Sequence, residues 1–333
     1  MSESVGSYLC PYCLNLHSTD QFECPTEALA IPKAYIRAQQ EGVRTASMLT
    51  IGYRGHGKTC YLASFMHSLY YGDPVDLWPG FSFIGLNQTT LDLVHTAYVN
   101  PLRMGVLPPR SNSFIRDCLI LEMHDVPLAR RAGPIVRGYA PQRLVLNLYD
   151  IGGEVYKAQE TIQQNLPLIS GLENLVLLID LGTARADAEV TGAGPAQQMH
   201  NLLNTVLNAI DELDQRGQKG IVVTFTKADR LWGDVDYGPL AQPASVRPQG
   251  ADGMRAYVGE TRRRSQAIGE WVRAEYPQFF NLLKAYFKPL AFTTVSALGT
   301  TPQGGDDGKT VNVLRPSGLF DPLLSLLIMD GFL

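Results

Sequence analysis

The sequence of 333 residues contains no apolar run that approaches the roughly 20 residues of a membrane-spanning helix. It also lacks a large excess of either charge. Its formal net charge is −4, which disfavours general electrostatic binding to nucleic acid or anionic lipid. The opening MSESVGSY has no apolar signal segment, and the closing DGFL has no cysteine for prenylation. We therefore expect a cytoplasmic protein without a membrane partner.

Cysteine is scarce and unevenly placed. Of five cysteines, Cys60 and Cys118 stand alone, and the other three cluster within the first 24 residues. An odd number with clustering disfavours a disulfide framework and favours reduced thiols.

The cluster has the spacing of a metal site. Cys10 and Cys13 form a C-x-x-C knuckle, Cys24 supplies a third thiol, and His17 is the nearest fourth donor, with Asp20 a weaker one. Zinc takes four ligands in a tetrahedron, and a segment this short cannot bury a core of its own. The pattern predicts a zinc-binding head; a ribbon without metal and a flexible leader with free thiols are the alternatives.

The segment from Ala46 to Tyr61 organises the rest of the chain. A short apolar strand leads into GYRGHGKT, Gly52 to Thr59, which matches G-x-x-x-x-G-K-[ST], and a helical pattern follows. Backbone N–H groups of such a loop and of the helix start bind phosphates. Lys58 is expected to reach the β- and γ-phosphates and Thr59 to bind Mg²⁺. The expected nucleotide-binding residues here are Gly52, Arg54, Gly55, His56, Gly57, Lys58, Thr59 and Cys60.

Residues 72–113 interrupt the regular pattern and suggest an insertion that ends in a first switch loop. TTLDLVHTAYVNPL within it predicts a helix with Leu91, Val94 and Tyr98 on one face. In the loop that follows, two serines could complete the Mg²⁺ shell and an arginine could offset phosphoryl charge. The alternative is a solvated arginine and serines that only turn the chain. These candidates are Arg110, Ser111 and Ser113.

Two apolar strands, 118–123 and 144–149, are expected to pair antiparallel across a polar turn. The second runs into Asp150-Ile-Gly-Gly-Glu, so Asp150 is placed to hold Mg²⁺. Gly153 is placed to meet the γ-phosphate with its N–H group. This segment predicts a second switch.

Two later strands end in loops suited to reading a base. Strand 220–225 ends in Thr226-Lys227-Ala228-Asp229, and strand 290–295 ends in Ser296-Ala297-Leu298. The carboxylate of Asp229 can accept hydrogen bonds from N1–H and the 2-amino group of guanine, a donor pair that adenine lacks. The stem of Lys227 can lie along the ring, and an N–H group of the second loop can donate to O6. The pair of loops predicts a preference for guanine.

The other segments are expected to be structural. Residues 26–45 suggest a connecting helix, and 175–180 a buried strand followed by a helix over 195–215. Residues 233–258 suggest a surface loop, after which the run Arg262 to Arg264 begins a helix with these arginines on a solvated face. Residues 319–329 predict a closing helix whose apolar face packs on a sheet.

With these motifs in order, the chain resembles the TRAFAC class of P-loop GTPases with a Ras-like fold. The resemblance implies an α/β fold of the P-loop NTPase type, a mostly parallel central sheet with helices on both faces, and a small zinc-knuckle-like head. The expected boundaries are 1–30 for the head, 31–45 for a linker helix and 46–333 for the GTPase domain, with insertions at about 72–113 and 233–258. The head resembles that of bacterial GTPases from conflict or signalling systems.

The resemblance implies a GTP-hydrolysing switch that uses Mg²⁺ and acts on a protein effector or an activating protein. Glu154 stands where Ras-like enzymes usually carry the water-orienting glutamine, and Arg54 stands where Ras has glycine. Lys58, Glu154 and Arg110 are the expected catalytic residues, with slow turnover. The alternatives are a GTP-binding adaptor that does not hydrolyse, and a P-loop ATPase or kinase.

Overall fold

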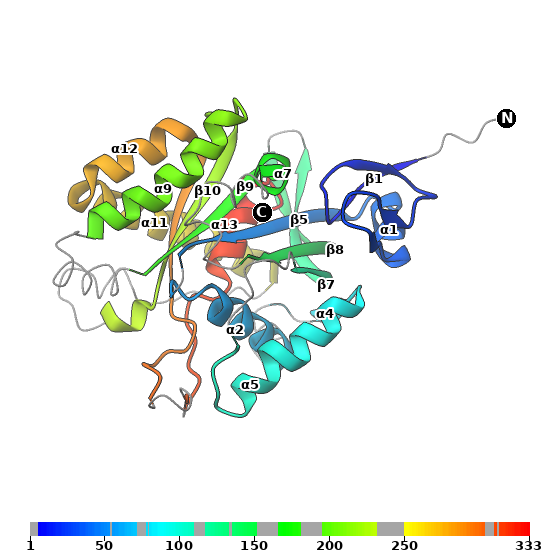
Figure 1. Cartoon of the computed structure of the whole chain (residues 1–333), viewed down its shortest axis with the longest axis horizontal. Coiled ribbons are helices and arrows are strands. Elements are labelled where there is room, and N and C mark those ends of the chain that lie inside the picture. The colour runs from blue at the N-terminus through cyan, green and yellow to red at the C-terminus, as the bar shows by residue number, and fades with distance from the viewer. Residues whose placement is uncertain are drawn as a thin grey trace.

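A seven-stranded mixed sheet forms the centre of the molecule (Figure 1). The computed structural model describes residues 6–53, 55–71, 78, 80–109, 117–132, 135–151, 166–180, 195–231, 250–303, 310–311 and 313–333. The strand order is β11-β10-β9-β5-β8-β7-β6. In chain order these strands are β5 (Arg44–Ile51), β6 (Ser82–Gly85), β7 (Asp117–Ala132), β8 (Ile135–Asp150), β9 (Asn174–Asp180), β10 (Lys219–Thr226) and β11 (Phe287–Val295).

The first five strands of that order, β11 to β8, are parallel, and β7 and β6 continue the sheet antiparallel. This confirms the expected antiparallel pairing of β7 with β8. Every residue of β9 and β10 is buried, as strands covered on both faces require. Because these strands are parallel, the carboxyl ends of β5, β8, β9, β10 and β11 lie along one edge of the sheet.

Helices cover both faces of the sheet. One core contains side chains of α7 (Leu166–Gly171), α9 (Pro195–Glu212) and α12 (Pro277–Tyr286). The other contains α2 (Lys58–Tyr71), α13 (Asp321–Met329), η1 (Val94–Val99) and Leu102 of α5 (Asn100–Arg103); α4 (Gln88–Leu93) precedes η1. Helix α11 (Gly250–Glu275) contributes to both cores. No helix formed by the described residues is both long and apolar enough to span a membrane.

The N-terminal head packs directly on the sheet, beside β5 and β8, and lies at the right of Figure 1. It consists of β1 (Ser7–Leu9), β2 (Leu16–Ser18), β3 (Glu23–Cys24) and β4 (Leu29–Ala30), followed by α1 (Lys33–Gln40). The hydroxyl of Tyr149 on β8 donates to the carbonyl of Pro11 at 2.7 Å. The head therefore shares the core of the sheet, which is how a segment too short to form its own core buries its apolar residues.

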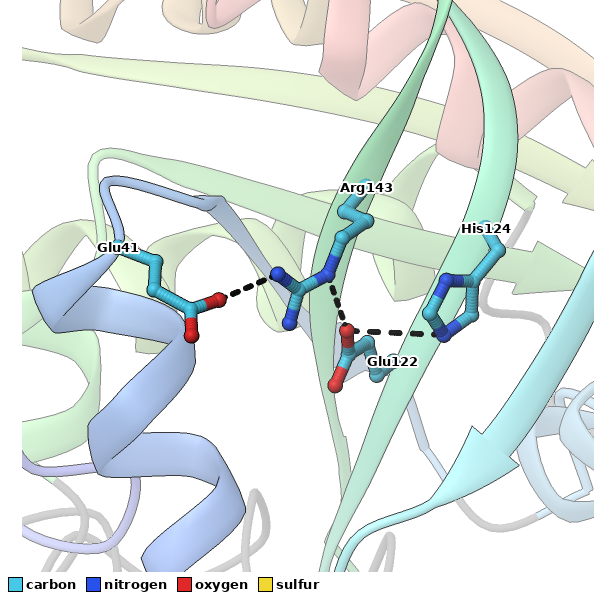
Figure 2. A network of polar contacts seen from close by, with 4 residues as sticks. All are labelled: Glu41, Glu122, His124 and Arg143. Carbon is cyan, nitrogen blue, oxygen red and sulfur yellow. Dashed lines mark hydrogen bonds and ion pairs between the residues drawn. The ribbon is translucent and has the colours of Figure 1, made fainter.

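The end of α1 is tied to the sheet by a network of charges (Figure 2). Arg143 on β8 lies between Glu41, which caps α1, and Glu122 on β7. His124 lies 3.6 Å from the same Glu122 carboxylate. Glu122 is buried, so Arg143 compensates a charge that would otherwise be costly to bury.

The prediction that residues 124–143 form a polar turn was wrong. Most of them belong to β7 and β8, each of which extends to 16 residues. A bulge between Met123 and Val126, with Asp125 at φ +57°, shifts the register there. Beyond it Val126 and Leu128 are buried. Their burial holds the segment in the sheet despite its polar and proline content.

Three further expectations need correction. Helix α11 begins at Gly250 rather than at Arg262, because Met254 and Tyr257 of the expected loop are buried on one helical face. Arg264 is not solvated: it donates to the buried Asp321 at 2.7 Å. On the predicted helix 89–102, Leu91 is exposed. The closing helix α13 does pack its apolar residues on the sheet, as expected.

Candidate functional sites

The glycine loop between β5 and α2 has the backbone of an anion-binding loop. Gly55 and Gly57 adopt φ values of +87° and +84°, which side chains with a Cβ rarely reach. Alternation of such residues with ordinary ones turns successive N–H groups toward one concavity. The loop leads into the first turn of α2 at Lys58, so the start of that helix faces the same space.

Three contacts fix this loop to the neighbouring strands. His56 donates from Nδ1 to the carbonyl of Leu178 on β9 at 2.9 Å, and its own carbonyl accepts from the Thr226 hydroxyl at 2.8 Å. A Cβ on Gly52 would lie 2.8 Å from that Leu178 carbonyl oxygen, so only glycine fits there. Burial lowers the pKa of His56, as does the nearby charge of Lys58, which keeps the ring neutral near pH 7.

Lys58 and Thr59 begin α2, as the motif requires. Lys58 is 5% exposed and donates from Nζ to the carbonyls of Gly52 at 2.6 Å and Tyr53 at 3.2 Å. Its amine therefore lies across the loop itself. Thr59 is half-buried.

Asp150 ends β8 beside this loop and is buried. It is the register partner of Thr50 on β5, and one of its oxygens accepts from Tyr98 at 2.9 Å. Burial raises the pKa of Cys60, with the Lys227 charge lowering it and the Asp150 charge raising it.

The two expected base-reading loops meet. Asp229 follows β10 and accepts a short hydrogen bond from the hydroxyl of Ser296, which follows β11. Ser296 is buried and exchanges backbone hydrogen bonds with Ser317. Lys227, at φ +58°, forms a short ion pair with Asp180 at the end of β9. Ala297 and Leu298 continue the second loop and are half-buried.

Six predicted site residues lie outside the described residues, so their positions are not tested: Arg54, Arg110, Ser111, Ser113, Gly153 and Glu154.

The groups at this edge fit a nucleotide with Mg²⁺. The loop offers N–H groups and an ammonium group for phosphate oxygens. The Thr59 hydroxyl and Asp150 carboxylate are hard oxygen donors of the kind that Mg²⁺ prefers.

The head brings together the four residues predicted to bind zinc. Cys10, Cys13, His17 and Cys24 are all buried, and their donor atoms lie within 4.8 Å of one another. Nε2 of His17 lies 3.3 Å from Sγ of Cys13. All five cysteines of the chain are free thiols.

The donor set and its surroundings fit zinc. Zn–S and Zn–N bond lengths imply donor-to-donor distances of roughly 3.5–3.8 Å in a tetrahedron. The four donors of the head, all within 4.8 Å of one another, lie near enough to share one ion. The backbone N–H of Tyr12 donates to Sγ of Cys10 at 3.4 Å. Burial raises the pKa of Cys13, but hydrogen bonds from the N–H of Asn15 and the Cys24 thiol outweigh it, so the pKa of Cys13 is lowered. For Cys10 burial outweighs the hydrogen bonds, and its pKa is raised. Hydrogen bonds to sulfur favour a thiolate, and Cys13 is the thiol in which they prevail.

Two residues at this edge of the sheet were not among the predicted site residues. Asp180 is fully buried and pairs with Lys227; an aspartate at the end of an apolar strand was a signal that could have found it. Tyr98 contacts Asp150, and no motif marks it. A cavity of about 520 Å³ lies elsewhere, between α11, β11 and α13, and is lined by none of the predicted site residues.

Comparison with protein-family models and with curated proteins gives no match. Among solved structures, the chain matches one described as the signal recognition particle receptor SRb-GTP/SRX complex from Chaetomium thermophilum. The two are 14% identical, the match covers 77% of this chain and 92% of the other, and the TM-score is 0.37. A likeness of this degree does not establish a family.

Proposed function

We propose that this protein is a Mg²⁺-dependent GTP-binding switch that hydrolyses GTP slowly and acts on a protein partner. One observation carries the proposal: the glycine loop, Asp150 and the Asp229–Ser296 pair come from separate segments and lie along one edge of the sheet. A loop for phosphates, a carboxylate for a divalent cation and a carboxylate for guanine are the three parts that GTP binding needs.

Each part has a role in binding. The N–H groups of residues 52–60 and the ammonium of Lys58 bind the phosphates. Thr59 and Asp150 would hold Mg²⁺, which supplies positive charge next to the β- and γ-phosphates when bound. The carboxylate of Asp229 accepts hydrogen bonds from the guanine N1–H and 2-amino group. The hydroxyl of Ser296 donates to the same carboxylate and fixes its orientation. Lys227 stays near the base through its ion pair with Asp180.

For hydrolysis, we propose that Glu154 orients the attacking water and that Arg110 offsets charge on the transferring group. Gly153 would sense the γ-phosphate, and Ser111 and Ser113 are the candidates for completing the Mg²⁺ shell. These roles come from the sequence pattern. Because Glu154 would act on the attacking water and not on the nucleotide, we expect Glu154→Ala to slow phosphate release without weakening GTP binding.

Nucleotide titration with GTP, GDP and ATP, followed by measurement of phosphate release, tests the proposal. We expect a preference for guanine nucleotides and slow release of phosphate from GTP. A preference for ATP would favour a P-loop ATPase or kinase instead. Tight GTP binding without phosphate release would indicate an adaptor that binds but does not hydrolyse.

We also propose that the head binds one Zn²⁺ ion through Cys10, Cys13, His17 and Cys24. The support is the burial and mutual proximity of three thiols and one imidazole, a set of donors that favours zinc over Mg²⁺ or Ca²⁺. Elemental analysis of purified protein should find one zinc per chain. Cys24→Ser should lower that content, whereas Cys60→Ser, outside the head, should not.

A further inference from the structure

Tyr98 contacts the carboxylate proposed to serve Mg²⁺, although it comes from an inserted segment with no nucleotide motif. Its side chain is 3% exposed, and its hydroxyl donates to Oδ2 of Asp150 at 2.9 Å. The two residues lie 52 positions apart in the chain. A buried hydrogen bond from a neutral donor to a carboxylate favours the ionised form and one orientation of the group.

The backbone around Tyr98 is unusual. Residues Val94–Val99 form a π-helical turn between α4 and α5. Such turns are rare and occur frequently at functional sites. Val94, Tyr98 and Val99 belong to the same hydrophobic core as α2, so the turn holds the tyrosine ring against the helix that carries Lys58 and Thr59.

The start of this helical segment is anchored on two sides. Asn87 caps α4 by accepting from the N–H of Thr90 at 3.0 Å. Its Nδ2 donates to the hydroxyl of Tyr12 in the head at 3.3 Å and to the carbonyl of Cys118 on β7 at 3.2 Å. The hydroxyl of Thr90 accepts from the N–H of Ile120 at 2.7 Å. The start of the segment that carries Tyr98 is therefore held by the head and the sheet together.

We propose that Tyr98 is a positioning residue for Asp150 and thereby sets the affinity of the site for Mg²⁺. The inference rests on the proposed GTP binding. The tyrosine does not touch the nucleotide in this proposal; it acts by fixing the carboxylate that holds the cation. Partners of this kind behind a metal ligand typically contribute 10- to 100-fold to metal affinity.

The test compares Tyr98→Phe with the wild-type chain by titrating a fluorescent GTP analogue at a series of Mg²⁺ concentrations and in EDTA. In Tyr98→Phe, the Mg²⁺ concentration for half-maximal binding should rise about tenfold, while the affinity measured in EDTA stays within about twofold. Tyr257→Phe is a matched control, because Tyr257 donates the same kind of hydrogen bond, at 2.7 Å, to the buried carboxylate of Asp321. Its Mg²⁺ dependence should equal that of the wild type.

Each other outcome overturns a specific step. If wild-type protein binds the analogue with the expected Mg²⁺ dependence and Tyr98→Phe does the same, the positioning role is wrong while the proposed function stands. If Tyr98→Phe also loses affinity in EDTA, its role is general support of the fold, and the positioning role is again wrong. If the wild type shows no binding or no Mg²⁺ dependence, the proposed function fails and this inference with it.

Discussion

Removal of the proposed zinc ion should destabilise the whole protein rather than the head alone. In the structure the cluster of Cys10, Cys13, His17 and Cys24 is not separated from the sheet. Its four residues lie next to side chains that complete the core over β5 and β8. The carbonyl of Pro11, which lies between Cys10 and Cys13, accepts a hydrogen bond from the buried hydroxyl of Tyr149. Loss of the head would expose that face of the sheet to water.

The magnitude follows from the buried side chains. Burial of one large apolar side chain is worth about 1.5–3 kcal/mol, and the head and α1 contribute several that are at most 8% exposed. Their combined contribution, of order 10 kcal/mol, is comparable to the total stability of about 5–15 kcal/mol typical of a folded domain. We therefore expect the sheet to lose most of its stability when the head unfolds. The buried side chains of this interface on the head and α1 are Tyr8, Tyr12, Leu14, Ile31, Tyr35 and Ile36.

The assay is thermal unfolding of zinc-loaded protein and of protein stripped by a strong chelator, with zinc content measured in both. Because structural zinc contributes about 10–16 kcal/mol in small zinc-binding peptides, we expect a single transition that falls by roughly 10 °C or more on stripping. Return of zinc should restore it. Two separate transitions, or an unchanged midpoint in protein verified to be free of metal, would refute the reasoning.

Three further predictions concern single residues. Asp229→Ala should lower the preference for GTP over ATP by roughly 100-fold or more, as measured by competitive titration, because the paired acceptor for guanine is lost; an unchanged ratio would contradict its role. Gly52→Ala should cost about 1–3 kcal/mol in urea unfolding, because its Cβ would lie 2.8 Å from the Leu178 carbonyl oxygen; Gly138→Ala, whose Cβ would meet nothing within 4 Å, is the control. Burial raises the pKa of Asp330 to about 6, so the folded state binds this proton more tightly than the unfolded state. Stability should fall as pH rises from about 4 to 6, and Asp330→Asn should flatten that fall in urea unfolding at each pH.

Local rules explain what was predicted correctly. The glycine loop could be predicted because positive φ at Gly55 and Gly57 is a backbone demand that the residue type itself records. The strands before Asp150 and Thr226 were visible as apolar runs bounded by polar residues. The C-x-x-C spacing likewise marked cysteines that the structure brings together with His17 and Cys24 in the head.

Errors arose where burial depended on distant parts of the chain. The segment after residue 123 has polar residues and prolines typical of a turn, yet it continues as strand because Val126 and Leu128 find a core to enter. The start of α11 was placed 12 residues too late for the same reason, since Met254 and Tyr257 are buried by elements that the local pattern does not contain.

The sequence by itself determined which chemical groups this protein has and in what order, because loop glycines, strand-end carboxylates and thiol spacing are local features of the chain. Only the tertiary structure decided which of these groups contact one another. It brings Ser296 into contact with Asp229, Asp180 with Lys227 and Tyr98 with Asp150. Such contacts join residues tens of positions apart, and they form only when the strands and helices that carry them have packed into one core.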